Sequence, residues 1–125
     1  MSAIPETMTV IAIEGKGGPD VLRPRVEPVP KPAPEQMLVK VTAAGVNRPD
    51  VQQRLGAYPP PATHSPLPGL EIAGEVVQVG ANVTRWQPGQ MVCALVNGGG
   101  YAEYCIAIGE YQRCPEFGKP LDACH

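Results

Sequence analysis

Short apolar runs rich in β-branched residues alternate with glycine- and proline-rich stretches along most of this chain. The run Met8–Glu14 (MTVIAIE) predicts a first strand. The run Met37–Ala44 (MLVKVTAA) alternates apolar and polar side chains in its first half, which predicts a half-buried strand. Three later runs fit a strand as well: Glu71–Gly80, Met91–Val96 and Tyr101–Ile108. Short strands separated by such turns predict a mainly β fold, a barrel or a sandwich.

The stretch VLRPRVEPVP, residues 21–30, carries prolines at Pro24, Pro28 and Pro30. Each proline lacks the N–H that a sheet ladder needs, so a central strand could not accept them. The stretch is therefore predicted to lie at the edge of a sheet.

A short helix is predicted within GVNRPDVQQRLGAYPPP, residues 45–61. Asn47 is a suitable N-cap, and Pro49 and Asp50 suit the first turn, where a missing donor costs nothing and a negative charge favours the dipole. Gly56 can end the helix. We expect one or two helical turns followed by an irregular proline-rich loop.

Length and charge narrow the class of protein. A chain of 125 residues is long enough for one domain and too short for two. Its 10 basic and 12 acidic residues give a net charge of -2 without any basic cluster, so a nucleic-acid partner is not expected. The sequence has no apolar run long enough to span a bilayer and no secretory signal pattern at its start, so we expect a cytoplasmic protein without a membrane partner.

The four cysteines are irregularly spaced and form no C-x-x-C pair. In a cytoplasmic protein we expect free thiols. Cys93 and Cys105, each inside an apolar run, are interpreted as small buried hydrophobes. Cys124 beside His125 resembles a metal or nucleophile pair, but its terminal position argues against a catalytic role.

Five motifs in order carry a resemblance to the medium-chain dehydrogenase/reductase superfamily, and within it to the NADPH-dependent quinone reductases related to zeta-crystallin. The resemblance runs from about Met8 to Ile108 and rests on GGPDVL, AAGVNRPDVQQRLGAYPPP, PLPGLEIAGEVVQVG, VTRWQPGQMV and GGGYAEYC. It implies the substrate-side, catalytic domain of such an enzyme, a partly open β-barrel similar to the co-chaperonin GroES with one or two short helices. The expected barrel spans residues 8–112, with residues 1–7 disordered and 113–125 an irregular tail where a cofactor domain would begin.

The resemblance also implies a site without zinc. In the zinc-dependent alcohol dehydrogenases of this superfamily, a cysteine and a histidine bind the catalytic metal at positions that match Asn47 and Leu70, and neither is a plausible zinc ligand. The four-cysteine loop of the structural zinc site is missing, because Gly99 and Gly100 lead directly into the next strand. Glu71 is expected to act structurally, as a hydrogen-bonding carboxylate that ties loops together.

Three residues match family positions that line the nicotinamide and quinone cleft. By that similarity, Asn47 hydrogen-bonds near the nicotinamide ribose, Asp50 orients the loop, and the Tyr58 ring packs on the acceptor. Asn47 and Asp50 are equally well explained as helix-capping residues, and the two roles are compatible. For Tyr58 the alternative is a loop anchor against the prolines that follow it.

The glycine-rich turn between strand and helix that receives the cofactor pyrophosphate in this superfamily has no counterpart in the 125 residues. The expected function is thus the substrate side of an NADPH-dependent quinone reductase, and the chain alone is expected to be inactive. Its uncovered interdomain face is expected to promote self-association. The alternative is a free-standing GroES-like module that binds a protein or an apolar ligand.

Overall fold

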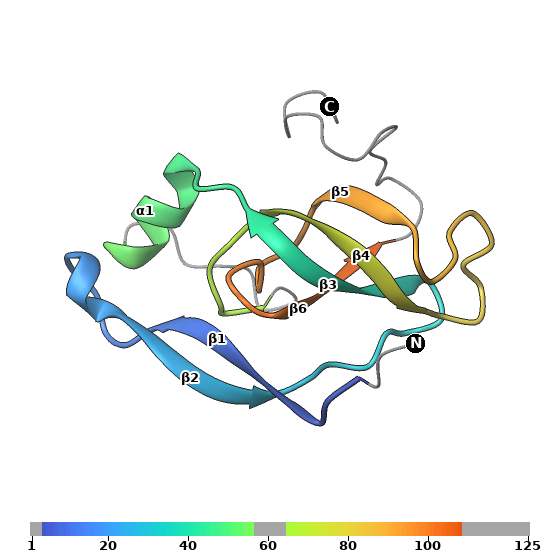
Figure 1. Ribbon diagram of the computed structural model, residues 1–125. Helices are drawn as coiled ribbons and strands as arrows, with labels where there is room; N and C mark the ends of the chain where they lie inside the picture. The colour runs from blue at the N-terminus through green and yellow to red at the C-terminus, as the bar shows by residue number, and fades with distance from the viewer. Residues whose placement is uncertain (1–3, 57–64, 109–125) are drawn as a thin grey trace.

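A computed structural model of the protein describes residues 4–56 and 65–108. The described residues form two antiparallel sheets, one of two strands in the order β1-β2 and one of four strands in the order β5-β4-β3-β6 (Figure 1). The elements are β1 (Thr7–Ile13), η1 (Pro19–Val21), β2 (Leu22–Pro28), β3 (Gln36–Ala44), α1 (Arg48–Arg54), β4 (Glu71–Val79), β5 (Met91–Leu95) and β6 (Tyr104–Ile108). The predicted mainly β fold is confirmed, with an open rather than a closed arrangement of the sheets.

Strand β2 lies at a sheet edge, as its prolines predict. Pro24 stands opposite Ile11 and Pro28 opposite Thr7, and β1 is the only described strand with which β2 pairs. A second neighbour would need backbone donors that these prolines lack.

Strand β3 is buried on both faces at its start, so the prediction of a half-buried strand is wrong there. Met37, Leu38 and Val39 all have zero exposure. Met37 and Val39 belong to a core cluster built from the four-stranded sheet, whereas Leu38 packs in a second cluster with residues of β1, including Met8 and Val10. The two-stranded sheet thus covers the face of β3 that alternation alone would have left to solvent.

Residues 101–103 connect the two sheets instead of extending β6, which begins only at Tyr104. The backbone N–H of Ile11 donates to the carbonyl of Tyr101 at 2.8 Å, and that of Glu103 donates to the carbonyl of Thr9 at 3.2 Å. The strand predicted from Tyr101 is therefore too long at its start, because the Tyr101 carbonyl and the Glu103 N–H bond to β1, and only the Glu103 carbonyl bonds to β3, at Val41.

The two described cysteines differ in oxidation state. Cys105 is a free, buried thiol whose pKa burial raises to about 12. Cys93 is also buried, but it is disulfide-bonded, so the expectation of a free thiol is wrong for that residue. Cys114 and Cys124 lie outside the described residues.

Within residues 4–56 and 65–108 there is no helix with the length and apolar character needed to cross a bilayer.

Candidate active site

The predicted short helix is present as α1, with Asn47 as its N-cap. The backbone N–H of Asn47 donates to Oδ2 of Asp50 at 3.0 Å, and the backbone N–H of Asp50 donates to the carbonyl of Asn47 at 3.0 Å. Asn47 keeps extended backbone angles, as an N-cap does, and Gly56 with φ +80° follows the helix end. The local sequence therefore folds the end of β3 into a tight turn that presents Asn47 ahead of α1.

Glu71, the first residue of β4, lies beside this turn. Nδ2 of Asn47 donates to Oε1 of Glu71 at 3.2 Å, and the backbone N–H of Gly45 donates to the carbonyl of Glu71 at 2.9 Å. The contacts join the segment after β3 to the start of β4, so the Asn47 side-chain amide is held from the neighbouring strand, while its backbone N–H is held from its own helix.

Tyr101 completes the cluster, although no sequence pattern pointed to it. Its hydroxyl lies 2.6 Å from Oδ2 of Asp50, the same oxygen that accepts the Asn47 N–H. Burial, and then the hydrogen bond with and the negative charge of Asp50, raise the pKa of Tyr101 far above the ordinary range of a phenol. The hydroxyl therefore stays protonated and donates. Its motif, GGGYAEYC, was assigned to a strand, and nothing in its pattern indicates that the ring points toward the helix.

Asp50 and Asn47 differ in access to solvent. Asp50 is only 5% exposed, whereas Asn47 is an exposed residue. Oδ1 of Asp50 is buried and has no hydrogen-bond partner within the described part of the chain. Asn47 is thus the most exposed member of the cluster, and Asp50 the most buried.

Tyr58 lies outside the described residues, so its expected place at the cleft stays a prediction.

Zinc does not fit the residues that stand at the two matched ligand positions. Leu70 has an aliphatic side chain without any donor atom, and the Asn47 amide is bonded to Glu71. Among residues 4–56 and 65–108, no three His, Cys, Asp or Glu side chains are grouped so that they could hold a metal ion.

Comparison with known proteins gives the family. Residues 33–122 match the alcohol dehydrogenase GroES-like domain. The chain belongs to this family. A trans-enoyl reductase of Pyricularia oryzae is 34% identical over 116 residues, which cover 86% of this chain and 31% of that protein. A quinone oxidoreductase of Lama guanicoe is 38% identical over 102 residues, covering 80% of this chain and 31% of that protein.

Among solved structures, a mycobacterial protein in complex with NADPH is similar with a TM-score of 0.78 and 31% identity, covering 94% of this chain and 36% of that chain. The GroES-like domain thus spans about a third of the length of the curated relatives named above.

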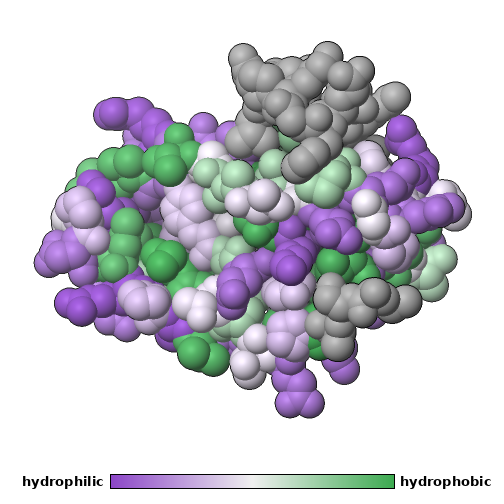
Figure 2. Space-filling model, in the orientation of Figure 1, coloured by the Kyte–Doolittle hydropathy of each residue, from purple (hydrophilic) through white to green (hydrophobic). Residues whose placement is uncertain are grey.

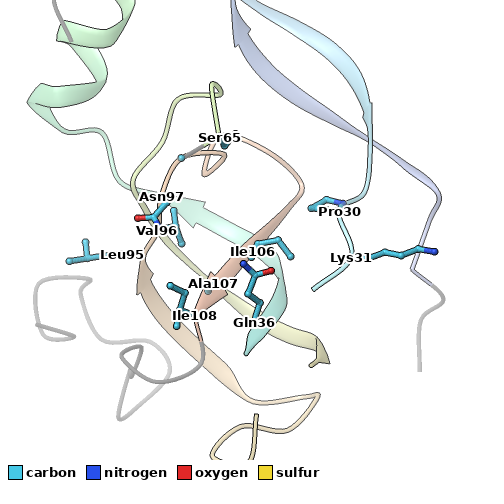
Figure 3. A pocket seen from close by; sticks show the side chains of 11 residues that line it. Pro30, Lys31, Gln36, Ser65, Leu95, Val96, Asn97, Ile106, Ala107 and Ile108 are labelled. Atoms are coloured by element: carbon cyan, nitrogen blue, oxygen red, sulfur yellow. The ribbon is translucent and has the colours of Figure 1, made fainter. Parts of the chain in front are cut away.

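One hollow in the described part of this GroES-like domain lies away from the Asn47 cluster. Its volume is about 490 Å³, and Figure 3 shows it between the residues after β5 and the end of β6, with Pro30 and Lys31 on the connector from β2. A smaller hollow of about 220 Å³ shares Pro30, Ser65, Gly98 and Ile106 with it. Neither of these two hollows is lined by Asn47, Asp50 or Glu71, and Asn47 is exposed at the start of α1.

Proposed function

We propose that this chain forms the substrate-side domain of a zinc-free, NADPH-dependent oxidoreductase that reduces a quinone or a similar enone. The observation that carries the proposal is an exposed Asn47 whose side-chain amide is bonded to Glu71 and whose backbone N–H is bonded to Asp50. The names of the relatives, a quinone oxidoreductase and a trans-enoyl reductase, support this substrate class, and the similar structure in complex with NADPH supports the cofactor.

When bound, the nicotinamide supplies the hydride. Asn47 has two amide N–H donors and one acceptor oxygen, and Glu71 uses one of these donors. We infer that the rest of the amide hydrogen-bonds near the nicotinamide ribose. Asp50 orients the turn, and Tyr58, which follows α1 in sequence, packs against the flat acceptor. Aligning two rings and excluding water are the main tasks of such a site.

By itself, a polypeptide of these 125 residues should bind NADPH weakly and turn over slowly. The sequence contains no glycine-rich strand-to-helix turn to hold the pyrophosphate, and binding energy from remote parts of a cofactor helps align its reacting ring. Saturable micromolar binding together with steady quinone reduction by the 125-residue chain would contradict this expectation.

The face beside α1 should also promote self-association of the free chain. Figure 2 shows apolar surface around α1, where Val46 is 78% and Leu55 is 49% exposed. Light scattering across a concentration series should show dimers or larger species, and Val46→Ser should reduce them.

A cytoplasmic location without nucleic-acid or membrane partners remains the prediction from composition.

A chimera tests the catalytic proposal. The chain replaces the corresponding N-terminal third of a quinone oxidoreductase relative, and NADPH oxidation is followed by absorbance with a benzoquinone and with an enone. We expect turnover that withstands chelators, and a loss of about ten- to a hundredfold in kcat/KM in Asn47→Ala, as for a lost positioning contact. A folded chimera that binds NADPH but reduces neither acceptor would overturn the substrate class. Loss of turnover after chelation would overturn the zinc-free assignment.

A further inference from the structure

We propose that Tyr101 is a positioning residue whose hydroxyl orients the Asp50 carboxylate and, through it, Asn47. The inference rests on the proposed function only where it assigns Asn47 to the nicotinamide. The geometry itself is a chain of hydrogen bonds from Tyr101 to Asp50 and from Asp50 to the N-cap of α1.

The backbone of Tyr101 is hydrogen-bonded to two segments distant in sequence, which fixes the position from which its ring extends. Its carbonyl accepts the N–H of Ile11 at 2.8 Å, and its N–H donates to the carbonyl of Pro68 at 3.2 Å. Gly69 lies so close that a β-carbon there would come within 2.6 Å of the Tyr101 nitrogen. Tyr101 thus links β1 and the residues just before β4, Pro68 and Gly69, to the helix.

The carboxylate of Asp50 depends on this phenol. Both of its described hydrogen bonds converge on Oδ2, from the Tyr101 hydroxyl at 2.6 Å and from the Asn47 N–H at 3.0 Å, while Oδ1 is buried without a partner within the described residues. A hydrogen bond from a neutral donor to a charged acceptor is among the stronger kinds. Without the hydroxyl, the carboxylate of Asp50, a residue only 5% exposed, would keep a single described partner, which favours its rotation toward water or another donor.

Rotation of Asp50 would release the backbone of Asn47. The turn would then keep the backbone bond from the Asp50 N–H to the Asn47 carbonyl, at 3.0 Å, and the longer side-chain bond to Glu71, at 3.2 Å, but it would lose the carboxylate that accepts the Asn47 N–H. We therefore expect that removal of the Tyr101 hydroxyl impairs the orientation of Asn47, although this hydroxyl need not touch the ligand.

The first test uses nuclear magnetic resonance on the full 125-residue chain. Tyr101→Phe keeps the ring and removes the hydroxyl, and Tyr104→Phe makes the same change three residues along, in the buried second core cluster. We expect the Asn47 backbone amide signal to shift and its hydrogen exchange to quicken by about tenfold in Tyr101→Phe, as for one lost hydrogen bond. Tyr104→Phe should leave that signal in place. An unchanged Asn47 amide in Tyr101→Phe, or an equal change in both variants, would overturn the proposal.

If Tyr101→Phe does not fold, Asp50→Asn takes its place, because it conserves size and removes the charge. The Tyr101 ring signals and the Asn47 amide signal should then change together. A change at Asn47 without any change at the Tyr101 ring would show that the two are not linked.

The second test is a double-mutant cycle in the chimera. Tyr101→Phe should raise the KM for NADPH or lower kcat by about tenfold when Asn47 is present and should have little further effect in Asn47→Ala, since coupled residues are not additive. Additive effects would indicate a merely structural role and would overturn the proposal. If Asn47→Ala alone changes neither constant, the role of Asn47 in the proposed function fails, while the resonance experiment still decides whether Tyr101 positions it.

Discussion

Gly45 lies against the Glu71 carboxylate so closely that a β-carbon on Gly45 would collide with Oε1 of Glu71. The Gly45 φ is not in the left-handed region, so the position requires space rather than an unusual backbone conformation. The same carboxylate oxygen accepts the Asn47 amide. A small residue after β3 therefore leaves room for the contact that tethers the candidate ligand-binding side chain.

Gly45→Ala should disturb this contact with little loss of stability. The collision is with the far end of a flexible side chain, so the carboxylate can move, and we expect a change of at most about 1 kcal/mol in the free energy of unfolding. The Asn47 side-chain amide signals should shift. The double variant Gly45→Ala/Glu71→Ala removes the collision and serves as the control, because its Asn47 signals should match those of Glu71→Ala alone. Unshifted Asn47 signals in Gly45→Ala would show that the carboxylate does not depend on Gly45.

Gly69→Ala should be far more destabilising than Gly89→Ala. Both glycines have positive φ, +104° and +98°, but a β-carbon at Gly69 would meet the backbone of Gly100 and Tyr101, whereas one at Gly89 would meet nothing within 4 Å. We expect about 1 to 2 kcal/mol for the backbone conformation alone at Gly89 and about 3 kcal/mol or more at Gly69, where overpacking is added. Denaturant unfolding of both variants measures the difference, and equal losses would contradict the close approach of these segments.

Stability should fall as the pH rises above about 10, the ordinary pKa of a phenol, in part because of Tyr101. The pKa of Tyr101 is raised in the folded state. The folded protein therefore keeps a proton that the unfolded chain releases, so this contribution is complete below the unfolded pKa and declines above it. Tyr101→Phe should reduce the decline.

This pH experiment is best done in a Cys105→Ala background, because the buried thiol, with its pKa raised to about 12, contributes with the same sign. Free energies of unfolding are measured at a series of pH values from 8 upward (a range chosen for the assay). They give the slope of stability against pH for the protein with the Tyr101 hydroxyl and for Tyr101→Phe. Identical slopes with and without the Tyr101 hydroxyl would mean that the phenol is not protected in the folded state.

The purified chain should carry no stoichiometric zinc, and chelators should leave its Tm unchanged. The physical reason is the donor set, with Leu70 aliphatic and the Asn47 amide a poor zinc ligand. Metal analysis of protein purified without chelator decides this. About one tightly held zinc per chain would reopen His64 and the free thiol of Cys105 as ligands.

The sequence by itself determined the features that depend on neighbouring residues. Prolines 24 and 28 placed β2 at an edge because a missing N–H excludes a second ladder wherever the strand lies. Asn47, Pro49 and Asp50 set the start of α1 through backbone groups within four residues of one another. The motif order predicted the family, and the match over residues 33–122 confirms it.

Only the tertiary structure decided which distant segments share a contact. Leu38 is buried because β1 packs over the second face of β3, and alternation along β3 carries no information about a strand that covers it. Tyr101 joins the site because its backbone bonds to β1 and to Pro68, which turns its hydroxyl toward a carboxylate 51 residues earlier in the chain. Hydrogen bonds of this kind depend on how the two sheets meet, and that is fixed by burial of both faces of β3 rather than by any local pattern of residues.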